Sequence, residues 1–119
     1  MNETENLVQK IVEGLQEKKG KNIVTIDVSK HMGAVCKYYV ICEGRTPTQI
    51  SALYDSVWDY VRKETGEKPI GQDGQRNAQW IAVDYGTVIV HILLPELREF
   101  YQFENLWADA KITSIPDLD

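Results

Sequence analysis

The sequence predicts a single α/β domain in which one mixed β-sheet is flanked by helices. Its 119 residues are the length of one compact domain, and 43% of them are hydrophobic, close to the globular average. Stretches with helical periodicity alternate with β-branched runs, in the order helix–strand–strand–helix–short strand–strand–strand–helix. We expect the domain to cover residues 1–112 and an acidic tail to follow over residues 113–119.

The N-terminal third predicts one helix and two strands. Gly20 is a natural end for the helix, whose acidic start and basic end match the helix dipole. Residues 23–28 alternate between two faces, and residues 37–42 are β-branched and aromatic, so both predict strands, with a loop between them. The apolar stripe of the helix consists of Leu7, Ile11 and Leu15, with Val8 and Val12 beside them.

The middle of the chain predicts a longer helix with a defined start. Thr46 is its expected N-cap, Pro47 takes the first helical position, and Gln49 completes a capping box. Gly66 is expected to end the helix. Its apolar face is formed by Ile50, Leu53, Tyr54, Val57, Trp58 and Val61.

The C-terminal half predicts a hairpin and a short helix. After a turn-rich segment at 68–79, two strands over 80–84 and 87–94 are separated by two residues. The second of these is Gly86, which accommodates the positive φ of a tight turn. The second strand is apolar on nearly all of both faces, so we place it centrally in the sheet. A short helix follows over residues 96–107.

Composition excludes several classes of protein. No apolar run approaches the ~18–20 residues of a membrane span. The N-terminus carries acids where a signal peptide needs positive charge, and two cysteines are too few for a disulfide framework, so we expect a cytoplasmic protein. The net charge of −5 disfavours direct binding to nucleic-acid phosphates.

The patterns for metal binding and nucleophilic catalysis are weak. Cys36 and Cys42 are expected on one face of a single strand, too far apart for a shared metal ion or a disulfide. A metal site of His31, Cys36 and the distant His91 is left as a minor alternative. Neither histidine lies beside a nucleophile in a signature spacing. We therefore expect no catalytic residue, no metal and no cofactor.

The patterns for phosphate chemistry are weak as well. The segment Gly44-Arg45-Thr46 joins a strand to a helix, where phosphate loops occur, but it lacks the GxGxxG and GxxxxGK[ST] patterns. A plain strand-to-helix connection is the favoured interpretation. Asp27 and Asp84 each stand alone on a predicted strand, whereas two-metal phosphoryl transfer needs paired carboxylates.

The C-terminal third concentrates aromatic residues and acidic charge. Aromatic residues and arginine are enriched in protein interfaces, and core packing is the alternative, which we favour for Phe100 and Phe103. A short helix cannot bury every aromatic side chain on one face, so part of this surface should be exposed. Six acidic and two basic residues lie from Glu96 to Asp119, which suits a basic protein partner, unless this charge only keeps the tail solvated.

Motifs in this region, with two upstream, resemble the ribosomal silencing factor (RsfS, Iojap-like) family. The resemblance covers about residues 5–112, and the motifs occur in the family's order. The matching segments are IDV at 26–28, YYVICEG at 38–44, WIAVDYGTVIVH at 80–91, REFY at 98–101 and FENLW at 103–107.

The resemblance implies a nucleotidyltransferase-like fold without catalytic residues, and hence a protein that is not an enzyme. It implies binding to protein fourteen of the large ribosomal subunit, on the 50S intersubunit face. Occupying that surface would block joining of the 30S subunit and repress translation under nutrient limitation. It also implies a homodimer when free. The alternatives are a large-subunit assembly factor and, less favoured, a nucleotide-binding phosphoryl-transfer enzyme.

The resemblance also implies a set of partner-binding residues. His91 is ambiguous between this role and a core hydrogen bond, and Leu106 between this role and the core. The chain departs from the family pattern at Lys37, Arg45 and Thr87, which make its surface less negative and would weaken contact with a basic partner. The expected partner-binding residues are Trp80, Asp84, His91, Arg98, Tyr101, Glu104, Leu106 and Trp107.

Overall fold

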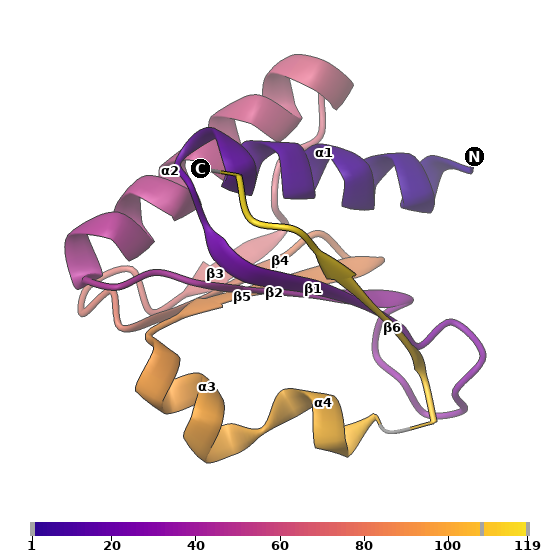
Figure 1. Cartoon of the computed structure of the whole chain (residues 1–119). Helices are drawn as coiled ribbons and strands as arrows, with labels where there is room; N and C mark the ends of the chain where they lie inside the picture. Colours follow the sequence, from indigo (N-terminus) through magenta and orange to yellow (C-terminus); the bar gives the residue numbers. More distant parts are fainter. Residues whose placement is uncertain (1, 108, 119) are drawn as a thin grey trace.

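A computed structural model describes residues 2–107 and 109–118 and contains a six-stranded mixed sheet with helices on both faces (Figure 1). The strand order is β3-β4-β5-β2-β1-β6, with β2 and β5 parallel and the other neighbours antiparallel. The predicted α/β class with one mixed sheet is confirmed, as are the hairpin and the central position of its second strand. The strands are β1 (Lys21–Asp27), β2 (Tyr38–Glu43), β3 (Gly71–Asp73), β4 (Trp80–Asp84), β5 (Val88–Leu93) and β6 (Lys111–Ile115).

The helices form two unequal layers (Figure 1). The long helices α1 (Glu3–Glu17) and α2 (Pro47–Thr65) pack side by side on one face of the sheet. The short helices α3 (Pro95–Tyr101) and α4 (Phe103–Leu106) lie across the other face. Within the described residues, no helix is both long and apolar enough to span a bilayer.

Local capping explains where α2 begins and ends. The Thr46 hydroxyl accepts a hydrogen bond from the Gln49 backbone N–H at 3.1 Å, as the sequence predicts. The Gln49 side chain accepts instead from the Arg45 N–H at 2.8 Å, so the predicted capping box is only half formed. Gly66 ends the helix in the left-handed conformation, at φ +81°.

Two hydrophobic cores lie on opposite faces of the sheet. Strand alternation divides β1 between them, because Ile23 belongs to the core under α1 and α2 while Val24 and Ile26 belong to the core under α3 and α4. The second core has few fully buried members and is completed by half-buried aromatic side chains. It therefore depends on α3 and α4 staying in place.

The C-terminal region differs from the sequence prediction in two ways. The helix predicted over 96–107 is two helices, because Gln102 adopts a left-handed conformation at φ +48° between them. Beyond it the chain returns to the sheet and forms β6 against β1, a strand that was not predicted. The expected boundary between residues 112 and 113 falls inside this strand. Asp119, the last residue of the expected tail, lies outside the described residues.

Candidate functional site

A cluster of stacked rings lies between the sheet and the short helices. We call it the aromatic cluster. Trp80 and His91 project from β4 and β5, and Phe103 packs against both, with ring centroids 5.3 Å and 5.1 Å away. Further ring contacts join Tyr101 to Trp80 and Trp107 to Tyr39. Its members are Tyr39, Trp80, His91, Tyr101, Phe103 and Trp107.

His91 serves the cluster as a hydrogen-bond acceptor. The Trp80 indole N–H donates to His91 Nδ1 at 3.0 Å. Burial lowers the pKa of His91 to about 4, because the charged imidazolium would be poorly solvated there. The ring is therefore neutral at neutral pH. This is the core hydrogen bond that the sequence analysis left open for His91.

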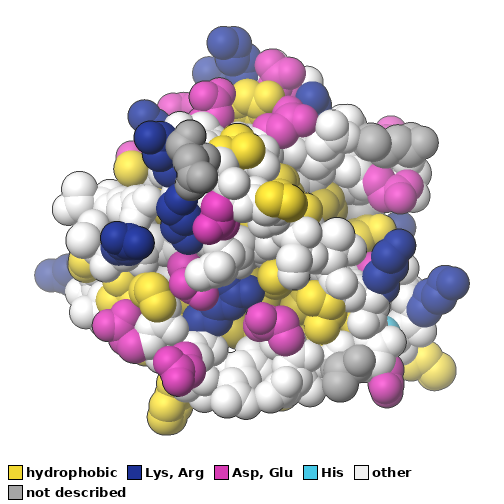
Figure 2. Space-filling view, in the orientation of Figure 1, with side chains coloured by type: hydrophobic (Ala, Val, Ile, Leu, Met, Phe, Trp, Pro, Cys, Tyr) yellow, Lys and Arg dark blue, Asp and Glu magenta, His cyan; other side chains and the backbone are white. Residues whose placement is uncertain are grey.

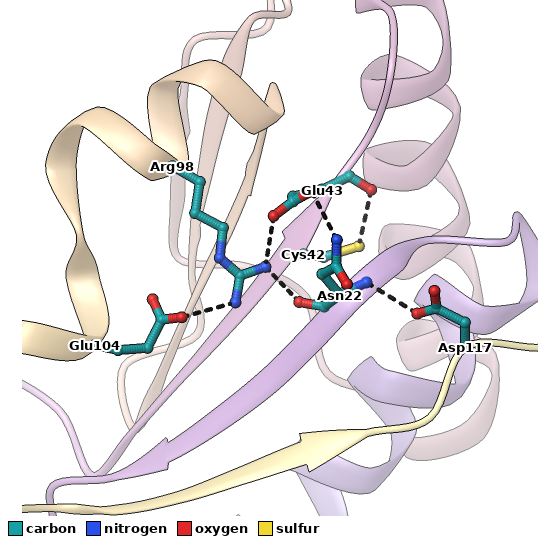
Figure 3. A network of polar contacts seen from close by, with 6 residues as sticks. All are labelled: Asn22, Cys42, Glu43, Arg98, Glu104 and Asp117. Atoms are coloured by element: carbon teal, nitrogen blue, oxygen red, sulfur yellow. Dashed lines mark hydrogen bonds and ion pairs between the residues drawn. The ribbon is translucent and has the colours of Figure 1, made fainter.

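Arg98 ties the short helices to the sheet (Figure 3). It is only 8% exposed. Its guanidinium donates to Glu43 at the end of β2 and to Glu104 in α4, each at 3.1 Å, and also to the backbone carbonyl of Asn22 in β1. Hydrogen bonds to two carboxylates and a carbonyl fix the orientation of this buried guanidinium. Arg98 and Glu104, predicted as partner contacts, therefore bind each other inside the protein.

Three large side chains remain open to solvent on the outside of the short helices. Phe100 is 78% exposed, Tyr101 48% and Leu106 70%. We call Phe100, Tyr101 and Leu106 the exposed apolar patch. The core alternative is therefore wrong for Phe100 and for Leu106, whereas Phe103 is half-buried in the aromatic cluster. The prediction that part of this aromatic surface is exposed is confirmed.

Acidic residues lie beside Phe100 at one side of the exposed apolar patch and form its acidic rim. Glu96 and Glu99 are exposed on α3, beside Phe100. Figure 2 shows acidic side chains gathered over α3, at the lower left, next to a projecting hydrophobic group. An apolar centre with an acidic rim is the arrangement that suits a basic protein surface.

Asp84 lies apart from the aromatic cluster. Its carboxylate accepts a hydrogen bond from the Gly86 N–H at 2.7 Å and so closes the β4–β5 turn. Gly86 has φ +88°, the left-handed conformation predicted for it. Trp80 stands at the other end of β4, so the structure does not bring these two predicted site residues together.

Sequence reasoning missed several members of this region. Tyr39 stacks on His91 and contacts Trp107, with centroids 5.9 Å and 5.7 Å away, and His31 contacts Trp107 at 5.5 Å. Strand alternation offered a signal for Tyr39, since it points to the same side of β2 as Ile41. No local pattern marked Glu43 as a partner of Arg98, because the two are 55 residues apart.

The structure also tests the cysteine expectations. Cys36 lies in the loop before β2 and packs in the core under α3 and α4, whereas Cys42 lies in β2 and faces α1 and α2. The prediction that they share one face of a strand is therefore wrong. Burial raises the pKa of both thiols, that of Cys42 to about 12, so neither is a reactive thiolate. Among the described residues, no group of three His, Cys, Asp or Glu side chains is arranged to hold a metal ion.

Comparison with known proteins identifies the family. All of residues 1–119 match the family described as "Ribosomal silencing factor during starvation", RsfS. The chain belongs to the RsfS family. An RsfS protein of Haemophilus influenzae is 38% identical over 102 residues, covering 86% of this chain and 98% of that protein. An RsfS protein of Chromobacterium violaceum is 33% identical over 109 residues, covering 92% and 88%.

Structure and more distant relatives agree with RsfS membership. A crystal structure of a Chromobacterium violaceum protein matches with a TM-score of 0.83 at 33% identity, over 90% of this chain and 88% of that one. A mouse protein named "Mitochondrial assembly of ribosomal large subunit protein 1" is 28% identical over 102 residues, covering 84% of this chain and 44% of its own length. The predicted family resemblance is confirmed, and membership supports a ribosome-associated role in translation regulation.

Proposed function

We propose that this RsfS-family chain binds protein fourteen of the large ribosomal subunit on the 50S intersubunit face. Bound there, it blocks joining of the 30S subunit and represses translation under nutrient limitation. The observation that carries this proposal is the exposed apolar patch with its acidic rim. Large aromatic anchors with a charged surround are typical of protein interfaces, and the acidic rim suits a basic ribosomal protein.

The scaffold behind the patch supports this assignment. Tyr101 packs on Trp80 at 4.9 Å between ring centroids, and Arg98 joins α4 to β2. Because these contacts order α3 and α4 before a partner arrives, little conformational entropy is lost on binding. We assign direct contact with the ribosomal protein to Tyr101 and Leu106, which the sequence analysis named, and to Phe100, which it did not name as a partner-binding residue.

The remaining predicted partner-binding residues take supporting roles in this proposal. Trp80 packs directly against Tyr101 of the patch, and His91 and Trp107 belong to the aromatic cluster behind it. Glu104 joins the acidic rim through the part of its side chain, 36% exposed, that Arg98 leaves accessible. Asp84 serves the β4–β5 turn.

Steric occlusion requires only that the bound chain covers the surface at which the 30S subunit would join. A standard interface of about 1,200–2,000 Å² covers enough of a subunit to exclude another at the same place. The action needs no chemical step, so we propose a protein that is not an enzyme. Because it acts on ribosomal subunits, we also propose that it is cytoplasmic, as the sequence analysis expects.

The test is co-sedimentation of the purified chain with isolated 50S and 30S subunits. We expect binding to 50S alone, and fewer 70S particles when the chain is added before the subunits are mixed. Tyr101→Ala and Phe100→Ala should each weaken 50S binding about 30-fold, about 2 kcal/mol. Thermal unfolding should be unchanged for Phe100→Ala, whereas Tyr101→Ala also loses its packing on Trp80 and should unfold at a somewhat lower temperature. Ile70→Ala removes an equally exposed side chain, 75% exposed, outside the patch and should bind normally. Binding to 30S, or equal binding by all four proteins, would contradict the proposal.

A second candidate is a factor for large-subunit assembly, which the name of the mouse relative favours. Deletion of the gene distinguishes the two in sucrose gradients. Immature large-subunit precursors would indicate assembly, whereas surplus 70S ribosomes in starved cells would indicate silencing. Heat on titration with ATP and Mg²⁺ would favour the less supported nucleotide-binding enzyme. The expected homodimer is tested by light scattering of the free chain.

A further inference from the structure

The outer edge of β6 is open. Among the described residues β6 pairs with β1 alone, since it ends the strand order, and four of its five residues are exposed. The segment Lys111–Ile115 contains neither proline nor glycine, and its register with β1 is uninterrupted. An edge of this kind exposes unpaired backbone groups and can accept another strand.

The hydrogen bonds of β1 show which of its residues direct their backbone N–H and C=O groups toward β2 and which direct them toward β6. The Val28 N–H donates to the Lys37 carbonyl at 2.9 Å, so at Val28 the backbone groups point toward β2. In antiparallel pairs this direction alternates along the strand. Thr25 and Asp27 therefore direct their backbone groups away from β2 and toward β6.

The same alternation identifies the free groups of β6. Thr25 and Asp27 pair with Thr113 and Lys111, whose backbone groups therefore point inward to β1. The intervening residue Ile112 and the following Ser114 direct their N–H and C=O groups outward. These two residues carry the hydrogen bonds that an added strand would take.

A groove runs beside this edge on the side of α1. It has a volume of about 520 Å³, and Val8 and Val12 of α1 contribute apolar walls. Lys111, Thr113 and Ile115, alternate residues of β6, line it as well. Figure 1 shows α1 passing above β6, and Figure 2, in the same orientation, shows hydrophobic side chains reaching the surface between α1 and the sheet. Every second side chain of an added strand would point into this groove.

The groove is negatively charged. Glu5, Glu13 and Asp27 line it, against Lys111 and against Lys10, which pairs with Glu13 at 3.3 Å, so one net negative charge remains. Hydrogen bonds from Tyr60 to Glu13 and from Ser29 to Asp27 hold the pKa of these two carboxyls below their ordinary values, so both are ionised at neutral pH. Basic side chains in the groove would therefore be stabilised, and acidic ones repelled.

We propose that the outer edge of β6 binds an extended, lysine- or arginine-containing segment of a partner protein as a seventh strand. Ile112 and Ser114 supply the backbone hydrogen bonds, and the groove takes the basic side chains. The apolar side chains of the segment lie on the opposite face, against Ile112. The proposal does not depend on the ribosomal role, because it uses no residue of the exposed apolar patch.

The test measures fluorescence anisotropy of a labelled eight-residue peptide that alternates valine and lysine. We expect Ser114→Pro to weaken binding at least tenfold, because it removes an outward N–H while leaving the ladder to β1 intact. Ser114→Ala keeps that N–H and should bind normally. Gln16→Lys, which places a positive charge in the groove lining, should also weaken binding. Unchanged binding by Ser114→Pro would overturn the proposal.

A second measurement keeps the test decisive if Ser114→Pro fails to fold. The same peptide, N-methylated at alternate residues so that it cannot pair at an edge, should not bind the unmodified chain. Hydrogen exchange should show protection of the 112 and 114 amides by the unmethylated peptide. Equal binding of a valine–glutamate peptide, or equal binding of the methylated one, would overturn the proposal. So would protection of those amides that rises with protein concentration without peptide, because a second copy would then occupy the edge.

Discussion

At the residue scale, Arg98 is nearly buried and pairs with two carboxylates, of which that of Glu43 is the less exposed. The Glu43 side chain is only 15% exposed, so removing the guanidinium would leave a poorly solvated negative charge. We expect Arg98→Ala to lower the free energy of unfolding by about 3 kcal/mol, measured by urea denaturation.

The control for Arg98 is a double variant. Arg98→Met with Glu43→Gln removes the cation and the less exposed of its two carboxylates and keeps most of the packing. The double variant should therefore be less destabilised than Arg98→Met and Glu43→Gln added together. An Arg98→Ala variant as stable as the unmodified chain would show that this network contributes nothing to stability.

The lowered pKa of His91 predicts that the free energy of unfolding depends on pH. Its folded pKa of about 4 lies below the ordinary value of 6.5, so between these values the unfolded chain binds a proton that the folded chain does not. Stability is therefore full above about pH 6.5 and falls as the pH drops toward 4. We expect a loss of about 2 kcal/mol between pH 7 and pH 5, measured by urea denaturation at each pH.

A matched variant isolates this titration. His91→Asn offers an oxygen near the position of Nδ1 to the Trp80 indole but does not titrate, so its stability should change little between pH 7 and pH 5. The lowered carboxyl pKa values of Glu13 and Asp27 act below this window. An equally steep profile in His91→Asn would assign the effect to other groups.

At the element scale, the break between α3 and α4 presents the exposed apolar patch. Gln102 occupies the left-handed region at φ +48°, which costs an L-residue about 1 kcal/mol and glycine little. We expect Gln102→Gly to raise the free energy of unfolding by about 0.5–1 kcal/mol in thermal or urea denaturation.

Gln102→Ala distinguishes the contribution of the backbone conformation to stability from that of the Gln102 side chain. It keeps the left-handed cost and loses only the exposed hydrogen bond from Asn105, 2.6 Å long, so it should bring no gain. Equal stabilisation by both variants would show that the backbone conformation is not the cause.

At the scale of the whole molecule, acidic charge lies on the face that carries the patch. Changing Glu96 and Glu99 to lysine should slow association with 50S subunits about tenfold at low salt and alter dissociation much less. Stopped-flow measurements at two ionic strengths test this. Asp55 and Asp59, exposed on α2 over the opposite face, provide the same charge change elsewhere. If that control slowed association equally, net charge and not the location of the rim would be responsible.

The candidate site was predictable only in part. The concentration of aromatic residues after Trp80 indicated the region, and the limited length of the helix indicated that some rings would be exposed. The roles of individual residues were not predictable. Arg98 is a charged residue that a sequence places on the surface, and only its approach to Glu43, 55 positions earlier, makes its burial stable.

Local sequence patterns were enough to predict α1, α2, the first two strands and the β4–β5 hairpin, because caps, turn glycines and hydrophobic periodicity act within a few residues. β6, the break at Gln102 and the degree to which each aromatic side chain is buried depend on contacts between distant parts of the chain. β6 is mostly exposed, so it has no burial pattern to detect, and it exists through pairing with β1, more than 80 residues earlier. Such contacts depend on where the chain returns in space, which local patterns do not encode.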